Sequence, residues 1–169
     1  VYKRQTLTMP DLPMLETILA AKLGDDGRTD SRGRGEDATV NRLEDLSAEI
    51  TGKEAAVFMP TGTFANSTAI MTCCHAGDKV LVEEEQHILL TEKFVFEKDY
   101  GRLIPVCYRL DHKHMPDPEE IDRLLSESGS KLVCLENSHN SAGGYCIDCS
   151  TLEKIRKVAD KHGAWIHMD

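Results

Sequence analysis

The 169-residue sequence has no apolar run long enough to cross a bilayer and no excess of positive charge. A membrane-spanning helix needs about 20 consecutive apolar residues, so the sequence predicts no such span. The formal net charge of −9 argues against nucleic acid and anionic membranes as partners, because both attract a basic surface. An anionic ligand would therefore need a local positive site, such as the first turn of a helix.

The sequence also lacks metal-ligating partners at a matching spacing for Cys146 and Cys149, which form a lone C-x-x-C motif. A zinc site ordinarily combines two such pairs, and a redox C-x-x-C belongs to a thioredoxin-like unit that is not evident here. We therefore predict no metal site. The six cysteines lie mostly among apolar residues, which is typical of free thiols in a reducing compartment, so we expect a cytoplasmic protein.

Helical and strand-like segments alternate along the sequence, and the length of the whole sequence suits about one domain. This alternation predicts an α/β fold in which a mostly parallel sheet is flanked by helices and preceded by an N-terminal helix. Helices are predicted over residues 10–23, 39–51, 61–74, 87–100 and 150–162, with another that begins at residue 117, and strands over 54–59, 79–83, 103–110, 132–135 and 164–168.

Polar residues follow several of the predicted strands at their carboxyl ends, where ligands bind in sheets of this kind. The turn Thr61–Gly62–Thr63 follows the first strand and begins a helix, whose unpaired N–H groups and dipole can hold an anion such as a phosphate. Residues 136–140 follow the fourth strand, and Asp169 follows the fifth. The sequence therefore predicts a ligand site at this edge of the sheet.

Each of these residues also has a purely structural interpretation. The hydroxyls of Thr61 and Thr63 suit an ordinary capped helix start. His87, after the second strand, is either a helix cap or a neutral imidazole that can stack on a ring or move a proton. Asp169 is either a cap or a carboxylate that pairs with a cation. The residues alone leave these alternatives open.

Five stretches of the sequence also form a pattern when they are taken together: Gly24–Asp26, Gly35–Glu44, Gly52–Ala56, Pro60–Thr63 and Leu135–Asn140. In order and spacing they resemble the L-threonine aldolase family, the fold-type-I, pyridoxal-phosphate-dependent aldolases that are grouped with the β-eliminating lyases. The resemblance covers about residues 6–169. It implies that the sheet is part of the large domain of a fold-type-I enzyme, with pyridoxal 5'-phosphate as the cofactor.

The resemblance also implies a role for each candidate residue. The turn Thr61–Gly62–Thr63 would bind the cofactor phosphate. His87 would stack on the pyridine ring and assist proton transfer, which makes it the catalytic candidate. Asn140 would form a hydrogen bond with the phenolic oxygen of the ring. Asp169, at the end of a strand similar to the family's, would pair with the protonated ring nitrogen, so that the ring can accept the electrons of a broken bond.

The function implied is the cleavage of a β-hydroxy-α-amino acid, such as L-threonine, to glycine and an aldehyde. One alternative is a pyridoxal-phosphate-dependent β-eliminating lyase or aminotransferase, and an alternative of another class is a non-catalytic fragment or binding module. The resemblance further implies a small amino-acid substrate and a homodimer or homotetramer.

We expect residues 1–169 to be the N-terminal portion of one large domain that is incomplete at its C-terminus. The carboxylate-binding Arg and the imine-forming Lys of the family would follow Asp169, so the fragment is expected to be inactive. Residues 1–5 do not match the family, and we expect them to be a non-native junction.

Overall fold

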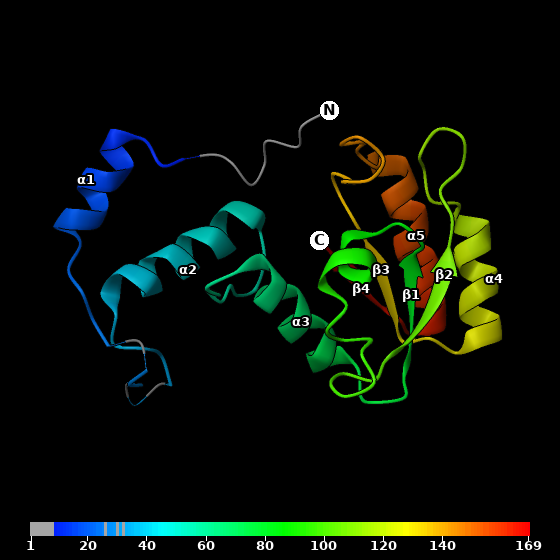
Figure 1. The fold of residues 1–169 in the computed structure, drawn as a ribbon, viewed down its shortest axis with the longest axis horizontal. Helices are drawn as coiled ribbons and strands as arrows, with labels where there is room; N and C mark the ends of the chain where they lie inside the picture. The colour runs from blue at the N-terminus through cyan, green and yellow to red at the C-terminus, as the bar shows by residue number, and fades with distance from the viewer. Residues whose placement is uncertain (1–8, 26, 30, 32) are drawn as a thin grey trace. The chain divides into compact units, whose positions relative to one another are not determined.

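The computed structural model describes residues 9–25, 27–29, 31 and 33–169. The junction expected at residues 1–5 lies outside the described residues. The chain forms two compact units, residues 1–58 and residues 59–169, and each is considered by itself (Figure 1). No helix in the described part of the chain is long and apolar enough to cross a membrane.

The first unit contains two helices, α1 (Leu12–Ala20) and α2 (Ala38–Thr51), which confirm two of the predicted helices. Both begin at an aspartate, because the carboxylate accepts hydrogen bonds from N–H groups of the first turn. The carboxylate of Asp37 also accepts a hydrogen bond from the N–H of Gly24 at 2.8 Å. Backbone hydrogen bonds, led by the one from Val40, hold the pKa of Asp37 below its usual value.

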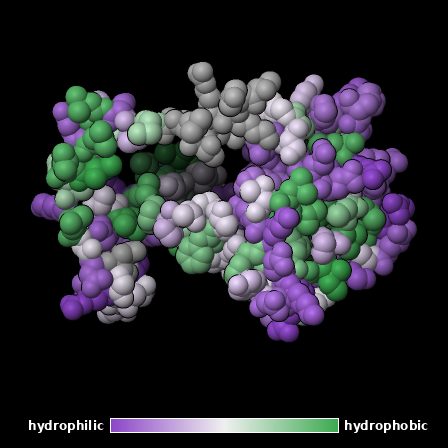
Figure 2. Space-filling model, viewed as in Figure 1, coloured by the Kyte–Doolittle hydropathy of each residue, from purple (hydrophilic) through white to green (hydrophobic). Residues whose placement is uncertain are grey.

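The apolar stripe of α2, which the periodicity predicts to be buried, is not buried in this unit. Neither helix of the unit has a fully buried residue. Leu43, Leu46 and Ile50 of α2 are all exposed, Ile50 to 74%. Leu19 of α1 is 86% exposed, and Figure 2 shows the apolar side chains of α1 at the surface. Two short helices enclose too little volume for a core, so the periodicity identifies the helix but not what covers it.

The second unit is a four-stranded parallel sheet with helices on both faces, as the sequence predicts. The strands lie in the order β2-β1-β3-β4, and each pair of neighbours is parallel. The strands are β1 (Lys79–Glu83), β2 (Ile104–Tyr108), β3 (Leu132–Leu135) and β4 (Trp165–Met168), and the helices are α3 (Gly62–Cys73), the π-helix η2 (Ile88–Glu92), α4 (Pro118–Ser128) and α5 (Cys149–His162).

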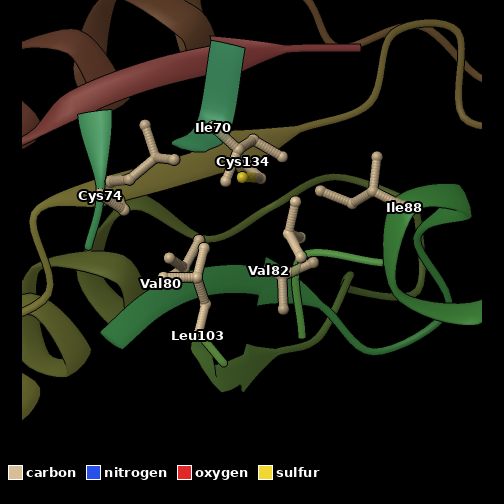
Figure 3. Packing of buried hydrophobic residues seen from close by; sticks show 9 residues of the cluster. Ile70, Cys74, Val80, Val82, Ile88, Leu103 and Cys134 are labelled. Atoms are coloured by element: carbon tan, nitrogen blue, oxygen red, sulfur yellow. The ribbon is translucent and has the colours of Figure 1, made fainter. Parts of the chain in front are cut away.

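Two apolar clusters, one on each face of the sheet, form the core of this unit. Successive side chains of a strand point to opposite faces, so β1 and β3 contribute to both clusters. Figure 3 shows the first cluster, in which Val82 of β1 and Cys134 of β3 lie near Ile70 of α3 and Ile88 of η2. In the second cluster, Leu81 and the alternate residues of β3 pack against α4 and α5. The two clusters fix the helices on either side of the sheet.

Two predicted elements are wrong. Residues 54–59 form no strand, and the N–H of Phe58 donates instead to the carboxylate of Glu44 at 2.9 Å. A strand needs a neighbour that accepts its backbone hydrogen bonds, and this stretch has none within the described residues. The helix predicted over residues 87–100 is limited to η2, because the chain leaves the helical conformation at Lys93, where φ is 53°. Turns follow.

Helices α4 and α5 have strong start signals, which is why α4 begins where the sequence predicts and the bounds of α5 agree closely with the prediction. They begin at Asp117 and Asp148 and end at Gly129 and Gly163, which adopt the left-handed conformation that glycine accommodates. The carboxylate of Asp148 accepts hydrogen bonds from the hydroxyl of Ser150 and from the N–H of the following residue, Thr151. These bonds, the one from Ser150 first, lower the pKa of Asp148 to about 2.

Asp148→Ala is expected to lower the melting temperature by a few degrees at pH 7, because the first turn of α5 loses its cap. The carboxylate has a pKa of about 2 in the folded protein, against about 3.9 in an unfolded chain. Its stabilisation is therefore present above about pH 4 and is lost as the pH falls toward 2. Thermal unfolding between pH 7 and pH 2 should show the two melting temperatures converging.

The matched control is Asp99→Ala, because the carboxylate of Asp99 has no polar contact within the described residues. Its melting temperature should follow that of the unsubstituted protein at every pH. A difference for Asp148→Ala that stays constant down to pH 2 would contradict the role of the carboxylate.

Candidate functional site

Polar residues follow the strands at one edge of the sheet. Because β1, β3 and β4 are parallel, their carboxyl ends meet at the same edge. The chain leaves β3 beside the end of β4, where the N–H of Asn137 donates to the carbonyl oxygen of Asp169 at 2.9 Å. The predicted convergence of residues 136–140 with Asp169 is therefore present in the structure.

The first turn of α3 offers an open anion site. Thr61 caps the helix, since its hydroxyl oxygen accepts a hydrogen bond from the N–H of Phe64 at 3.1 Å. The N–H groups of Gly62 and Thr63 have no hydrogen-bond partner within the described residues, and both residues are exposed. A Cβ added to Gly62 would meet no atom within 4 Å. The turn thus leaves room for a group such as a phosphate against two unpaired N–H groups.

Asp169 contacts the same helix through its side chain. Its Oδ1 accepts a hydrogen bond from Nδ2 of Asn66 at 3.0 Å. Asn66 follows Gly62 by four residues, which is a rise of about 6 Å along the helix axis. The carboxylate of Asp169 therefore contacts α3 little more than one helical turn beyond the predicted phosphate-binding turn.

His87 lies at the same edge, between two carboxylates. Its backbone N–H donates to Oε2 of Glu136 at 2.8 Å. Its Nδ1 is 3.5 Å from Oε1 of Glu92, a residue whose side chain is only 7% exposed. The imidazole itself is partly exposed. The backbone and one ring nitrogen are thus engaged by the protein, whereas Nε2 has no partner within the described residues.

Glu136 connects His87 to Asn140. Its second oxygen, Oε1, accepts a hydrogen bond from the N–H of Asn140 at 2.6 Å, so a single buried carboxylate fixes the backbone of two predicted site residues. The side chain of Asn140 makes no hydrogen bond in the part of the chain that the structure describes. From the sequence alone, Glu136 had no specific role. Its position directly after a predicted strand is the sequence signal that identifies it as a site residue.

A second buried carboxylate, that of Glu83, contacts His139 in the loop that follows β3. His139 and Glu83 are both buried, and Nε2 of the histidine is 3.0 Å from a carboxylate oxygen of Glu83. The other ring nitrogen, Nδ1, accepts a hydrogen bond from the N–H of Ala142 at 3.2 Å, so the proton of a neutral ring must be on Nε2. Burial raises the pKa of Glu83. This pair joins the loop after β3 to the end of β1.

A groove of about 650 Å³ runs along the exposed side of α3. Thr61 and Thr63 lie at one end, and Glu92 and Phe94 line it from the neighbouring segment. Elsewhere, Cys146 and Cys149 are exposed free thiols. Within the described residues, no group of three or more His, Cys, Asp or Glu side chains is placed to hold a metal ion.

The parallel sheet with helices on both faces and a polar carboxyl edge is the architecture of fold-type-I enzymes. The alanine aminotransferase of Pyrococcus furiosus superimposes with a TM-score of 0.62 at 19% identity, over 92% of this chain and 38% of that one. A structure from Clostridium difficile 630, provisionally described as a PLP-bound aminotransferase, gives a TM-score of 0.54 at 22% identity, over 66% of this chain and 28% of that one. The predicted fold class is confirmed.

The chain belongs to the beta-eliminating lyase family, whose sequence profile matches residues 5–169. It is also 43% identical over 182 residues to the low specificity L-threonine aldolase of Escherichia coli (strain K12), over 99% of this chain and 49% of that protein. The chain thus spans about half the length of the curated relatives that it matches. The resemblance found in the sequence is confirmed at the level of the family.

Glu136→Gln is expected to weaken the binding of pyridoxal phosphate about tenfold. A carboxylate accepts hydrogen bonds at both oxygens, whereas an amide would turn its NH₂ group toward the N–H of either His87 or Asn140. Titration of the cofactor-free protein, followed by absorbance, measures the dissociation constant. Glu127→Gln, an exposed change on α4, should leave the constant unchanged. Equal constants for Glu136→Gln and the unsubstituted protein would show that Glu136 does not support the site.

Proposed function

We propose that the complete protein is a pyridoxal-phosphate-dependent carbon–carbon lyase. It would cleave a β-hydroxy-α-amino acid such as L-threonine to glycine and an aldehyde. The observation that carries this proposal is the hydrogen bond from Asn66 to Asp169, because it brings the acidic end of the site close to the first turn of α3. The name of the Escherichia coli relative supports the choice of substrate.

The family and the PLP-bound neighbour indicate pyridoxal 5'-phosphate as the cofactor. When bound, this cofactor supplies an aromatic ring that accepts the electrons of a bond broken at the substrate's Cα. The residues present fit such a group, since the chain offers an anion site at one end and a carboxylate at the other.

The first turn of α3 would bind the phosphate. The N–H groups of Gly62 and Thr63 and the helix dipole favour negative charge at this position. The hydroxyl of Thr61 accepts a hydrogen bond from Phe64 but keeps its own proton, which can be donated to a phosphate oxygen. The hydroxyl of Thr63 is a second such donor.

Asp169 would bind the ring nitrogen. Its Oδ1 is engaged by Asn66, and Oδ2 has no partner within the described residues. A carboxylate at this position stabilises the protonated nitrogen, because an opposite charge in contact favours the charged form. Asn140, whose N–H is held by Glu136, would direct its side-chain amide to the phenolic oxygen of the ring.

His87 would stack on the face of the ring and move a proton. Its Nδ1 faces Glu92, so Nε2 is the nitrogen that remains available to accept a proton from a substrate hydroxyl. The contact between Glu92 and Nδ1 would stabilise the ring when it carries that proton. We further propose a small amino-acid substrate and a homodimer or homotetramer in the cytoplasm.

A β-eliminating lyase or an aminotransferase is the second candidate. The description of the family and the two aminotransferase-like folds favour it, and the residues that hold the cofactor would be the same. A non-catalytic binding module is the third. The products formed from an amino acid separate these three functions.

The complete protein, with any coding sequence that continues past Asp169, is expected to release acetaldehyde and glycine from L-threonine in equal amounts. Asp169→Ala should lower kcat by about 100-fold, because the transition state loses an electrostatic partner of the ring. Asp99→Ala should not change it. A coupled assay for the aldehyde measures the rate. A 2-oxo acid and ammonia in place of the aldehyde would indicate elimination, and no product at all would favour the binding module.

A further inference from the structure

Two carboxylates at the edge of the sheet share one side-chain amide. Nδ2 of Asn66 is 3.0 Å from Oδ1 of Asp169 and 3.3 Å from each carboxylate oxygen of Glu92. Asn66 is buried, with 7% of its surface exposed, and the side chain of Glu92 is exposed to the same extent. The three residues come from α3, from η2 and from the end of β4, so the amide joins segments that are distant in the sequence.

The chemistry of these neighbours determines the orientation of the amide. Ionised carboxylates only accept hydrogen bonds, so the NH₂ group of Asn66 must face Asp169 and Glu92, one hydrogen toward each. The amide oxygen then faces His167, whose Nε2 is 3.0 Å away and must be the donor. Burial lowers the pKa of His167, which agrees with a neutral ring. Both hydrogens and the oxygen of the amide are thus used.

The amide also separates two like charges. Without its NH₂ group, Asp169 and Glu92 would face each other across a partly buried space, where like charges repel more strongly than they do in water. Glu92 in turn lies 3.5 Å from Nδ1 of His87. A displacement of either carboxylate would therefore change the position of a group that the proposed mechanism uses.

We propose that Asn66 is a positioning residue. Its amide holds Asp169 by Oδ1, which leaves Oδ2 directed to a ring nitrogen, and it holds Glu92 against His87. The purpose of this arrangement rests on the proposed function, but the arrangement itself exists without the cofactor and can be tested without it.

The first test uses the cofactor-free, unsubstituted protein. Nuclear magnetic resonance of ¹⁵N-labelled histidine side chains reports which ring nitrogen carries the proton. The proposal requires the Nε2–H tautomer for His167 at neutral pH. The Nδ1–H tautomer would mean that the amide of Asn66 donates to the histidine and turns its oxygen toward the carboxylates, which would overturn the proposal. A failure of the protein to bind pyridoxal phosphate would refute the proposed function without affecting this result.

The second test measures the dissociation constant of pyridoxal phosphate in variants of the complete protein. Asn66→Ala should raise it about tenfold. Asn66→Asp, which keeps the shape but adds a third carboxylate, should raise it further. Ala69→Ser, an exposed change on the same helix outside the groove, is the control and should leave it unchanged. Dissociation constants for both Asn66 variants equal to that of the unsubstituted protein would overturn the proposal.

A third measurement separates positioning from a general loss of structure. The ¹⁵N shift of the ring nitrogen in labelled cofactor reports its protonation. In Asn66→Ala it should move toward the value of neutral pyridine, whereas a protein that was only less stable would keep the protonated value in its bound fraction. A protonated nitrogen in Asn66→Ala would count against the proposal.

Discussion

The hydrogen bond between Asn66 and Asp169 is the contact on which the proposed site depends. The sheet fixes one partner, since the N–H of Asp169 continues the pairing of β4 with β3 by donating to the carbonyl of Leu135. The core fixes the other, because Ile70 lies one turn after Asn66 on the same face of α3 and is fully buried against the sheet. Apolar packing thus determines where a polar contact forms between two residues that are 103 positions apart in the sequence.

The rest of the edge shows how a polar site is kept stable at the margin of an apolar core. Each buried carboxylate has donors: Glu136 has two backbone N–H groups, and Glu83 has His139 and the N–H of Glu85. An unpaired buried charge would cost several kcal/mol, so these donors are a condition for folding as well as for function. The amide of Gln86 differs from these carboxylates, because its buried Nε2 donor has no partner within the described residues.

The sequence predicts this architecture where one local signal is sufficient. Strands β1 and β3 appear at their predicted bounds because continuous apolar runs indicate strands buried on both faces. The prediction fails at residues 54–59 and 87–100, where the outcome depends on neighbours that periodicity does not reveal. The same limit applies to the site. Residues at strand ends were recognisable, whereas Asn66 and Glu92 acquire their part only through contacts between distant segments.

The proposed function requires one cofactor to bridge the first turn of α3 and the carboxylate of Asp169. A crystal structure of the complete protein with pyridoxal phosphate tests it most directly. We expect phosphate oxygens within hydrogen-bond distance of the N–H groups of Gly62 and Thr63, and the ring nitrogen against Oδ2 of Asp169. A phosphate bound away from this turn, or a ring nitrogen turned away from Asp169, would contradict it.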